Sequence, residues 1–280
     1  MAGKAWNRSS DTSTYYNEAV INDLMIIVAD EDGVIESCNS LGGCTEGDIL
    51  AKTGGKRIFA LANGPSPEGW SSLEDVYAAT AELGEWNDPD NEFIMSGETE
   101  CCVTGDRTIH CPMTVERYVS RITLKELNNE LPEQFGNLIV ENIIISNATG
   151  DIRLDGTAHD GTWYNKMGLE EADSPNCTIY SVETRLFCGE SLEESIRLYS
   201  YPNPTEEDVC GVSDYFTPRY TRMVISVLMN GEEYFYPISI QQPKRNRGYD
   251  IYLTLMHPGG KDPDIPIDPA AICLKVVEDG

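Results

Sequence analysis

The strongest constraint on the fold is a run of apolar residues near the start of the chain, Leu24 to Ala29, followed by Asp32-Gly33. Successive side chains on a strand point to opposite faces, so a run that is apolar at every position predicts a strand buried on both sides. The run is too short and too rich in β-branched residues for a helix. Asp32-Gly33 predicts a hairpin turn, and Val34-Ile35 begins the return strand. We therefore expect this hairpin to lie at the centre of a β-sandwich.

Short strands separated by turns follow along the rest of the chain. They are predicted at Arg57–Ala62, Glu92–Met95, Glu100–Thr104, Arg107–Met113, Val115–Lys125, Leu138–Ser146, Thr178–Phe187, Ser195–Tyr201, Arg222–Met229, Glu233–Ile240, Tyr249–Met256 and Ile272–Val277. One helix is predicted over Ser71–Leu83, because Ser71 and Glu74 have capping-box spacing and Gly84 can end it. This pattern is typical of an all-β chain built of sandwiches.

The strand Val115–Lys125 contains a break in its alternation. Val115 and Val119 share one parity, whereas Ile122 and Leu124 share the other. Because a slip of one residue moves every side chain to the other face, we expect a bulge or a change of sheet near Ser120. We place the domain boundary at this break, which gives an N-terminal domain of residues 1–116 and a C-terminal domain of residues 117–280.

The composition is strongly acidic, with 47 Asp and Glu residues against 20 Lys and Arg residues and a formal net charge of -27. Such a surface repels phosphate groups, which argues against nucleic-acid binding and against docking on anionic membranes. No apolar run approaches the roughly 20 residues of a transmembrane helix. The first residues also lack the apolar segment of a signal peptide. We therefore expect either a cytosolic protein or a chain that begins after a removed signal.

The chain has nine cysteines, and because the number is odd at least one is unpaired within the chain. No Cys-x-x-Cys occurs, which argues against zinc sites and thioredoxin-like redox motifs. We expect most of them to be small buried apolar residues or to form structural disulfides. They are Cys38, Cys44, Cys101, Cys102, Cys111, Cys177, Cys188, Cys210 and Cys273.

Catalytic patterns are weak throughout the sequence. His110 and Cys111 are adjacent, and neighbours on a strand point to opposite faces, so adjacency does not make a nucleophile pair. His159 lies in a loop rich in Gly and Thr and is predicted to be a solvated turn. Gly54-Gly55-Lys56 precedes a strand, whereas a phosphate-binding loop follows a strand and opens a helix. We expect no catalytic residue.

Two groups of residues leave ligand binding open. Acidic turns could offer oxygens to calcium or be ordinary turn chemistry, and none has EF-hand spacing: Asp30-Glu31-Asp32, Asp88-Pro89-Asp90 and Asp262-Pro263-Asp264. Aromatic residues could form a glycan platform or pack as cross-strand pairs: Tyr215, Phe216, Tyr220, Tyr234, Phe235 and Tyr236. We expect no cofactor and no metal, which leaves a structural or binding protein.

Four segments, taken in order, resemble the fimbrillins, the subunits of type V pili of Bacteroidales. They are the strand and hairpin of Leu24–Ser37, the basic strand and Ala-Asn pair of Gly55–Gly64, the Arg-x-x-x-Arg strand of Val115–Ile122, and Arg247–Leu255 with Pro258–Pro266. The last segment is the most specific, because both order and spacing agree. The resemblance covers nearly the whole chain.

The resemblance implies two tandem transthyretin-like Greek-key β-sandwich domains with one short helix. It also implies a lipoprotein precursor that is exported to the outer membrane and acts in adhesion as a stalk, accessory or tip subunit. In such proteins a trypsin-like protease removes an N-terminal strand, and a strand of the next subunit fills the groove by β-augmentation. The implied partners are other pilus subunits, with a surface receptor as a further partner.

Processing in this family follows an arginine ahead of the first central strand, and Arg8 is the only arginine before Leu24. The resemblance therefore assigns the processing site to Arg8, with a solvated arginine in a flexible arm as the alternative. The sequence ends just after Ile272–Val277, so we expect either that this last strand is the donor or that the protein is an accessory, tip or anchor subunit. The competing hypothesis is a surface adhesin or glycan-binding module that does not polymerise. An enzyme would require His159 to lie in a cluster with Asp and Cys side chains.

Overall fold

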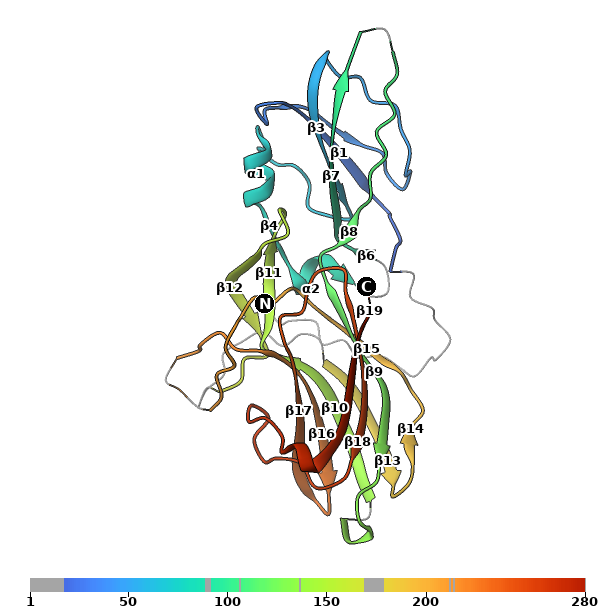
Figure 1. Ribbon diagram of the computed structural model, residues 1–280, viewed down its shortest axis with the longest axis vertical. Coiled ribbons are helices and arrows are strands. Elements are labelled where there is room, and N and C mark those ends of the chain that lie inside the picture. Colours follow the sequence, from blue (N-terminus) through green and yellow to red (C-terminus); the bar gives the residue numbers. More distant parts are fainter. Residues whose placement is uncertain are drawn as a thin grey trace. The chain divides into compact units, whose positions relative to one another are not determined.

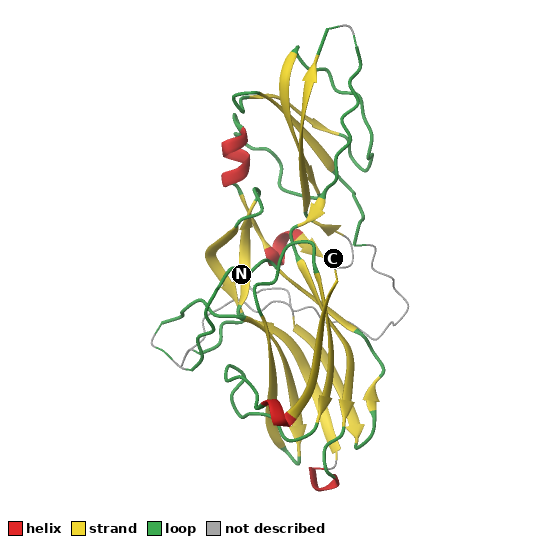
Figure 2. Cartoon of the chain, viewed as in Figure 1, coloured by secondary structure: helices red, strands yellow, loops and turns green. Residues whose placement is uncertain are grey.

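The computed structural model describes residues 18–88, 92–105, 107–135, 137–168, 179–211, 213 and 215–279. Nearly all of the regular structure in this part of the chain consists of β-strands (Figures 1 and 2). The predicted all-β fold class is therefore confirmed. Contacts divide the chain into two compact units. The first unit contains the described residues up to Val119 together with Asp151–His159, and the second contains Ser120–Gly150 and the described residues from Asp160 onward.

The first unit is built on a five-stranded antiparallel sheet with the strand order β2-β1-β3-β7-β8. Its strands are β1 (Leu24–Asp30), β2 (Ile35–Ser40), β3 (Gly54–Ala62), β7 (Met95–Val103) and β8 (Glu116–Arg117). Ile27, Val28 and Ala29 are all buried, which confirms that β1 is covered on both faces. The predicted hairpin is present, since Gly33 has a φ of +83° and the Asp30 carboxylate accepts hydrogen bonds from the turn.

The helix of the first unit, α1 (Leu73–Ala78), is shorter than predicted. Its capping box uses Ser72 and Asp75, one residue later than expected. Hydrogen bonds from Ser71 and Ser72 hold the pKa of the Asp75 carboxyl at about 2. The helix stops because Ala79 is extended and leads into β4 (Thr80–Glu82), which pairs with the chain from Asp151 to Arg153. A long-range strand pairing has therefore overridden the local helical pattern.

The pairing of β4 explains how a late segment joins the first unit. The sheet β12-β11-β4 is formed by β4, β11 (Ala148–Arg153) and β12 (Ala158–Tyr164). The boundary between the two units crosses both β11 and β12. A short helix, α2 (Leu83–Trp86), and the pair of strands β5 (Asn87–Asp88) and β6 (Glu92–Phe93) complete the first unit.

The second unit contains two sheets. One has the antiparallel order β13-β10-β16-β17, and the other has the order β14-β9-β18-β19 with β15 also paired to β9. Their strands are β9 (Ser120–Asn129), β10 (Asn137–Ser146), β13 (Ile179–Phe187), β14 (Ser191–Leu192), β15 (Ile196–Ser200), β16 (Thr221–Met229), β17 (Glu232–Ile240), β18 (Gly248–Leu255) and β19 (Ile272–Asp279). Single-turn 3-10 helices lie at Glu133–Phe135 and Pro269–Ala271. The core is formed by fully buried residues of β9, β10, β16 and β18, such as Leu124, Ile143, Ile225 and Ile251.

Two local predictions differ in outcome. The break expected near Ser120 is present, because β8 ends at Arg117 and β9 begins at Ser120. The strand predicted at Arg107–Met113 is wrong, since residues 107–115 carry no regular strand. This segment contains Pro112, which lacks the backbone N–H that a ladder requires.

None of the helices in the described part of the chain is long and apolar enough to cross a membrane.

Candidate functional site

The side chain of Asn63 anchors the segment that leads into β1. Its Nδ2 donates to the carbonyl oxygens of Val20, at 2.8 Å, and Phe93, at 3.0 Å. Its Oδ1 accepts from the backbone N–H of Asn22, at 2.9 Å, and of Asp23, at 3.3 Å. Asn63 is buried and has a φ of +54°, which Asn tolerates better than most residues. The Ala-Asn pair noted in the sequence therefore fixes the point where the N-terminal segment enters the first unit.

A buried carboxylate holds the same segment a few residues earlier in the sequence. Glu18 forms an ion pair with Arg117 of β8, the first arginine of the Arg-x-x-x-Arg segment. Glu18 is almost fully buried, so its charge requires this partner. The predicted processing residue, Arg8, lies outside the described residues, on the N-terminal side of this anchored segment.

The basic strand β3 satisfies its charges within the first unit. Lys56 is buried, and its Nζ lies 3.3 Å from Glu36 Oε1. Arg57 donates to Glu98 at 2.9 Å and to the hydroxyl of Tyr77 at 2.9 Å. The hydrogen bond with Glu98 raises the pKa of Arg57. These cations therefore stabilise the sheet and offer no basic patch for an anionic partner.

The last strand, β19, is the most exposed long strand in the second unit. It pairs with β18 along its whole length, from Ile272 to Asp279, and no described strand pairs with its other edge. Leu274 and Val276 are each 41% exposed, and Val277 is 38% exposed. Leu274 and Val276 point to one face and Val277 to the other, so both faces of β19 present apolar side chains to solvent. An open edge with such side chains is a surface to which another chain can add a strand.

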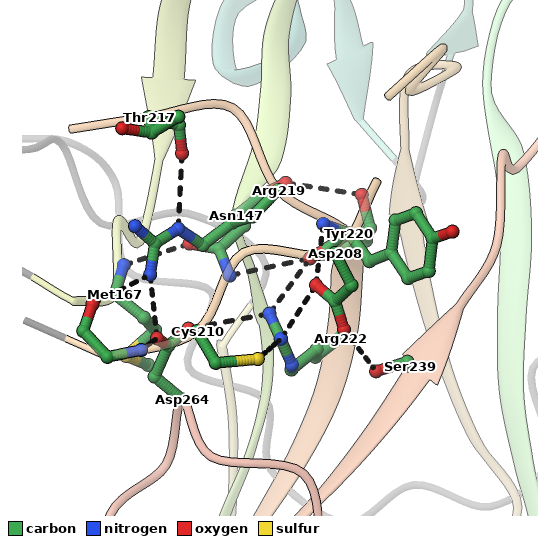
Figure 3. Close-up of polar contacts among 12 residues, drawn as sticks. Asn147, Met167, Asp208, Cys210, Thr217, Arg219, Tyr220, Arg222, Ser239 and Asp264 are labelled. Carbon is green, nitrogen blue, oxygen red and sulfur yellow. Dashed lines mark hydrogen bonds and ion pairs between the residues drawn. The ribbon is translucent and has the colours of Figure 1, made fainter. Parts of the chain in front are cut away.

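Two buried arginines form a polar network near the start of β16 (Figure 3). Arg219 Nη1 donates to Asp264 Oδ2 at 2.6 Å, and Arg222 Nη2 donates to Asp208 Oδ1 at 2.8 Å. Arg222 Nη1 also lies 3.4 Å from Asp264 Oδ1. The backbone N–H of Gly211 donates to Asp264 as well, at 2.8 Å. Two cations thus face two carboxylates, and the network joins loops to β16. Arg219 Nη2 and Arg222 Nε are buried and have no hydrogen-bond partner among the described residues.

Cys210 lies beside this network. Its sulfur is 3.3 Å from Arg222 Nη2, and Asp208 lies near it. Partial desolvation of the sulfur, followed by the charge of Asp208, raises the pKa of the Cys210 thiol. A thiol with a raised pKa is a weak nucleophile near neutral pH, so the neighbouring arginine does not create a reactive cysteine here.

The acidic turns serve other purposes than a calcium site. Asp264 is the buried partner of the two arginines, and Asp30 accepts hydrogen bonds from its own hairpin turn. The turn at residues 88–90 lies partly outside the described residues. Among the residues that the structure describes, no group of three or more His, Cys, Asp or Glu side chains is placed to hold a metal ion.

His159 is paired with a carboxylate. Its Nδ1 lies 2.8 Å from Asp151 Oδ2 within the first unit. The cluster with both Asp and Cys that an enzyme reading requires does not form among the described residues. The pair connects β12 with β11, so it stabilises the small sheet.

The aromatic residues do not gather into one platform. Phe216 packs against Trp163, with 5.2 Å between ring centroids, and Tyr236 is buried and donates to the carbonyl oxygen of His257. Tyr220 precedes the first residue of β16, whereas Tyr234 pairs with Val227 near the far end of that strand. At the usual rise per residue these two tyrosines are separated by about 20 Å. The aromatic residues that offered a glycan platform as one alternative therefore lie in separate environments.

The cysteines differ from expectation. Eight of the nine are described, all eight are free thiols, and none is buried. The expectation was that most would be small buried residues or form structural disulfides, and none of these eight is buried or disulfide-bonded in the structure. Cys177 lies outside the described residues.

Sequence reasoning found some of these features and missed others. The segment containing Asn63 was noted, because Ala-Asn closes a basic strand. The arginine network was missed, since Arg219 and Arg222 are adjacent to no unusual motif and Asp264 has the sequence signature of a turn. The acidic composition is one signal for such ion pairs. Carboxylates outnumber basic side chains in this chain, so two arginines close together are expected to pair with carboxylates.

Comparison with known proteins identifies the fold. No protein-family model matches the chain, and no curated protein sequence matches it. Solved structures do match, including a candidate cell adhesion protein from Bacteroides eggerthii at 16% identity, with 93% of this chain and 89% of that chain covered and a TM-score of 0.68. A fimbrilin from Porphyromonas gingivalis W83 matches at 15% identity, with coverage of 97% and 95% and a TM-score of 0.67. A candidate cell adhesion protein from Parabacteroides distasonis matches at 15% identity, with 96% of each chain covered and a TM-score of 0.66.

At such identities the similarity concerns the fold. The chain therefore has the fold of a fimbrilin over nearly all of its residues, as the four segments implied. None of these three structures is described as an enzyme.

Proposed function

We propose that this chain is a non-enzymatic subunit of a cell-surface fimbria that joins other subunits by strand addition, with β19 as the donor strand. One observation carries the proposal, namely that β19 has a single paired edge and exposed apolar side chains on both faces, in a chain with the fold of a fimbrilin. A strand held by one neighbour exposes less new surface when it leaves than a strand held by two.

The physics of such a joint is β-augmentation. Backbone hydrogen bonds supply affinity, and alternate side chains that enter pockets supply specificity. Leu274 and Val276 share one face of β19 and are suited to such pockets. Because a donor and an acceptor edge on the same chain form a head-to-tail contact, the assembly would be an open filament.

The proposal includes export as a lipoprotein precursor to the outer membrane and a role in adhesion. Within it, processing occurs after Arg8, ahead of the anchored segment at Glu18. The chain would comprise the N-terminal domain of residues 1–116 and the C-terminal domain of residues 117–280, with Asp151–His159 contributing to the first. The other subunits of the fimbria are the partners.

Limited trypsin digestion followed by electrophoresis without boiling tests the proposal. We expect trimming after Arg8 and a ladder of detergent-resistant oligomers. The variant Arg8→Gln should keep its N-terminal arm and stay monomeric. Lys52→Gln removes one exposed cation from the first unit and serves as the matched control, which should form the ladder.

The donor strand has its own test. Val276→Asp places a charge on an exposed position of β19, so the free subunit should fold, whereas the ladder should disappear because a carboxylate cannot enter an apolar pocket. A ladder that persists in Val276→Asp would exclude β19 as the donor.

A second candidate function is a surface adhesin that does not polymerise. It is favoured by the complete pairing of β19 with β18 of the same chain, which an exchange would have to break. Protein that is trimmed after Arg8 but stays monomeric would support this candidate, or a tip or anchor subunit, over a stalk subunit.

A further inference from the structure

We propose that Cys101 and Cys111 form a disulfide that ties the segment after β7 to the open edge of that strand. The nine cysteines offer many pairings, and the structure singles out this one. This pair is supported by the register of β7, the course of the chain from residue 107 to 117, and the contact between the two thiols.

The register places the two cysteines opposite each other. β7 pairs with β8 antiparallel, with Met95 opposite Arg117 and Ser96 opposite Glu116. In an antiparallel pair, each step forward on one strand is one step back on the other. If this register were continued for five more residues, Cys111 would be the counterpart of Cys101.

The chain continues along β7 beyond the last ladder pair. A side chain built on Gly97 would meet the carbonyl oxygen of Thr114 directly, and Met113 Cγ at 3.3 Å. Residues 113 and 114 thus still lie against β7, although they form no regular ladder. Gly97 is required here because the segment passes too close for a Cβ.

The phase of the hydrogen bonds favours a disulfide at this position. The backbone N–H of Tyr118 donates to the carbonyl oxygen of Ile94, so that pair is hydrogen-bonded. Pairs alternate along an antiparallel ladder, which makes Met95 with Arg117 a non-hydrogen-bonded pair. The same alternation, continued to Cys101 and Cys111, gives the non-hydrogen-bonded spacing. The Cα atoms of such pairs are about 4.5 Å apart, within the range of about 4.4 to 6.8 Å that a disulfide spans.

The two thiols also interact in the structure. Burial, followed by a hydrogen bond with the Cys111 thiol, raises the pKa of Cys101 to about 11. Cys102, the next residue on β7, is exposed and points to the opposite face of the strand. It is therefore placed poorly for the same bond.

The bond forms by thiol–disulfide exchange with a disulfide oxidant such as oxidised glutathione. One protein thiolate attacks the oxidant, forms a mixed disulfide and releases one glutathione thiolate. The second protein thiolate then attacks the protein sulfur of that mixed disulfide and releases the second glutathione. Two electrons pass from the protein thiols to the oxidant, and the two protons end on the two released glutathione molecules.

The consequence concerns the edge of the first sheet. β8 pairs with only Met95 and Ser96, so the outer edge of β7 from Gly97 to Val103 has no ladder partner among the described residues. A disulfide at Cys101 holds the neighbouring segment over this edge and keeps it from pairing with another chain.

Peptide mapping tests the bond. The full chain is incubated with oxidised glutathione, the remaining thiols are blocked with iodoacetamide, and the protein is digested with trypsin without reduction. Trypsin separates Ile58–Arg107, which carries Cys101 and Cys102, from Thr108–Arg117, which carries Cys111. We expect these two peptides to remain linked, with a mass about 2 Da below their sum because two hydrogens are lost, and to separate with dithiothreitol.

Matched serine variants assign the partner. Cys102→Ser should keep the linked peptide, whereas Cys101→Ser and Cys111→Ser should lose it. Fragmentation of the linked wild-type peptide locates the bond between the two adjacent cysteines independently of how the variants fold. Unlinked peptides in the oxidised wild type, or a link that maps to Cys102, would overturn the proposal.

Discussion

The first and last strands of the described chain, β1 and β19, make an instructive pair. Both have apolar side chains on both faces, and both belong to antiparallel pairings. β1 lies between two neighbours, and Ile27 is 0% exposed, whereas β19 has one neighbour and Val276 is 41% exposed. An apolar pattern on both faces therefore indicates that a strand is stabilised by burial of its side chains. The position of the strand in the sheet decides whether residues of its own chain bury them.

The largest expected effect is at the centre of β1. Ile27→Ala should lower the free energy of unfolding by about 3 kcal/mol, because it removes buried methyl groups and leaves a cavity in a strand covered on both faces. Urea unfolding followed by tryptophan fluorescence measures this change. A loss below about 1 kcal/mol would contradict the burial assigned to β1.

The next effect concerns the anchor that precedes β1. Asn63→Ala should cost about 2 kcal/mol, because two backbone carbonyl oxygens and two backbone N–H groups lose their partner. Asn230→Ala is the matched control, since Asn230 has nearly the same backbone conformation, with a φ of +53°, but is exposed. Equal losses in the two variants would mean that the backbone conformation, and not the hydrogen bonds, accounts for the effect.

A smaller effect is expected at the helix that supports the β1–β2 hairpin. The backbone N–H of Leu73 donates to Gly33, so the cap of α1 is joined to the hairpin turn. The folded pKa of Asp75, about 2, lies below the ordinary value of about 3.9. The cap therefore stabilises the fold fully above that ordinary value, and its contribution is lost as the pH falls through the folded pKa.

Amide hydrogen exchange of α1 between pH 4 and pH 2 measures this loss, after correction for the intrinsic pH dependence of exchange. Asp75→Asn should remove the pH dependence, because an amide cannot be protonated in this range. A variant that keeps the same pH profile would show that another carboxyl is responsible.

The smallest effect is expected in β19. Val276→Ala should change the free energy of unfolding of the free subunit by no more than about 0.5 kcal/mol, because Val276 is 41% exposed and lies at the sheet edge. Urea unfolding under the conditions used for Ile27→Ala allows direct comparison. A loss similar to that of Ile27→Ala would remove the contrast between the two strands.

Much of the fold could be predicted from local patterns. The hairpin at Gly33 and the break near Ser120 depend on neighbouring residues, and the structure contains both. The helix was overestimated, because the strand Thr80–Glu82 is set by its pairing with Asp151–Arg153, far along the chain. No periodicity within a short window carries that information.

The candidate site was predictable only in part. The last strand was recognised from its β-branched residues, but its exposure follows from its place at the edge of a sheet, which depends on the whole topology. Likewise, the burial of Arg219 and Arg222 depends on Asp264, which the chain brings to them from a distant loop.

The pairing of β4 with β11 has a consequence for how the protein is made. A chain that emerges from a ribosome, or from a translocation channel, presents Thr80–Glu82 long before Asp151–Arg153. The sheet β12-β11-β4 of the first unit is therefore incomplete while the first strands of the second unit are already emerging. Folding of the two units is interleaved in time, and a chaperone that binds the unpaired strand β4 would act during this interval.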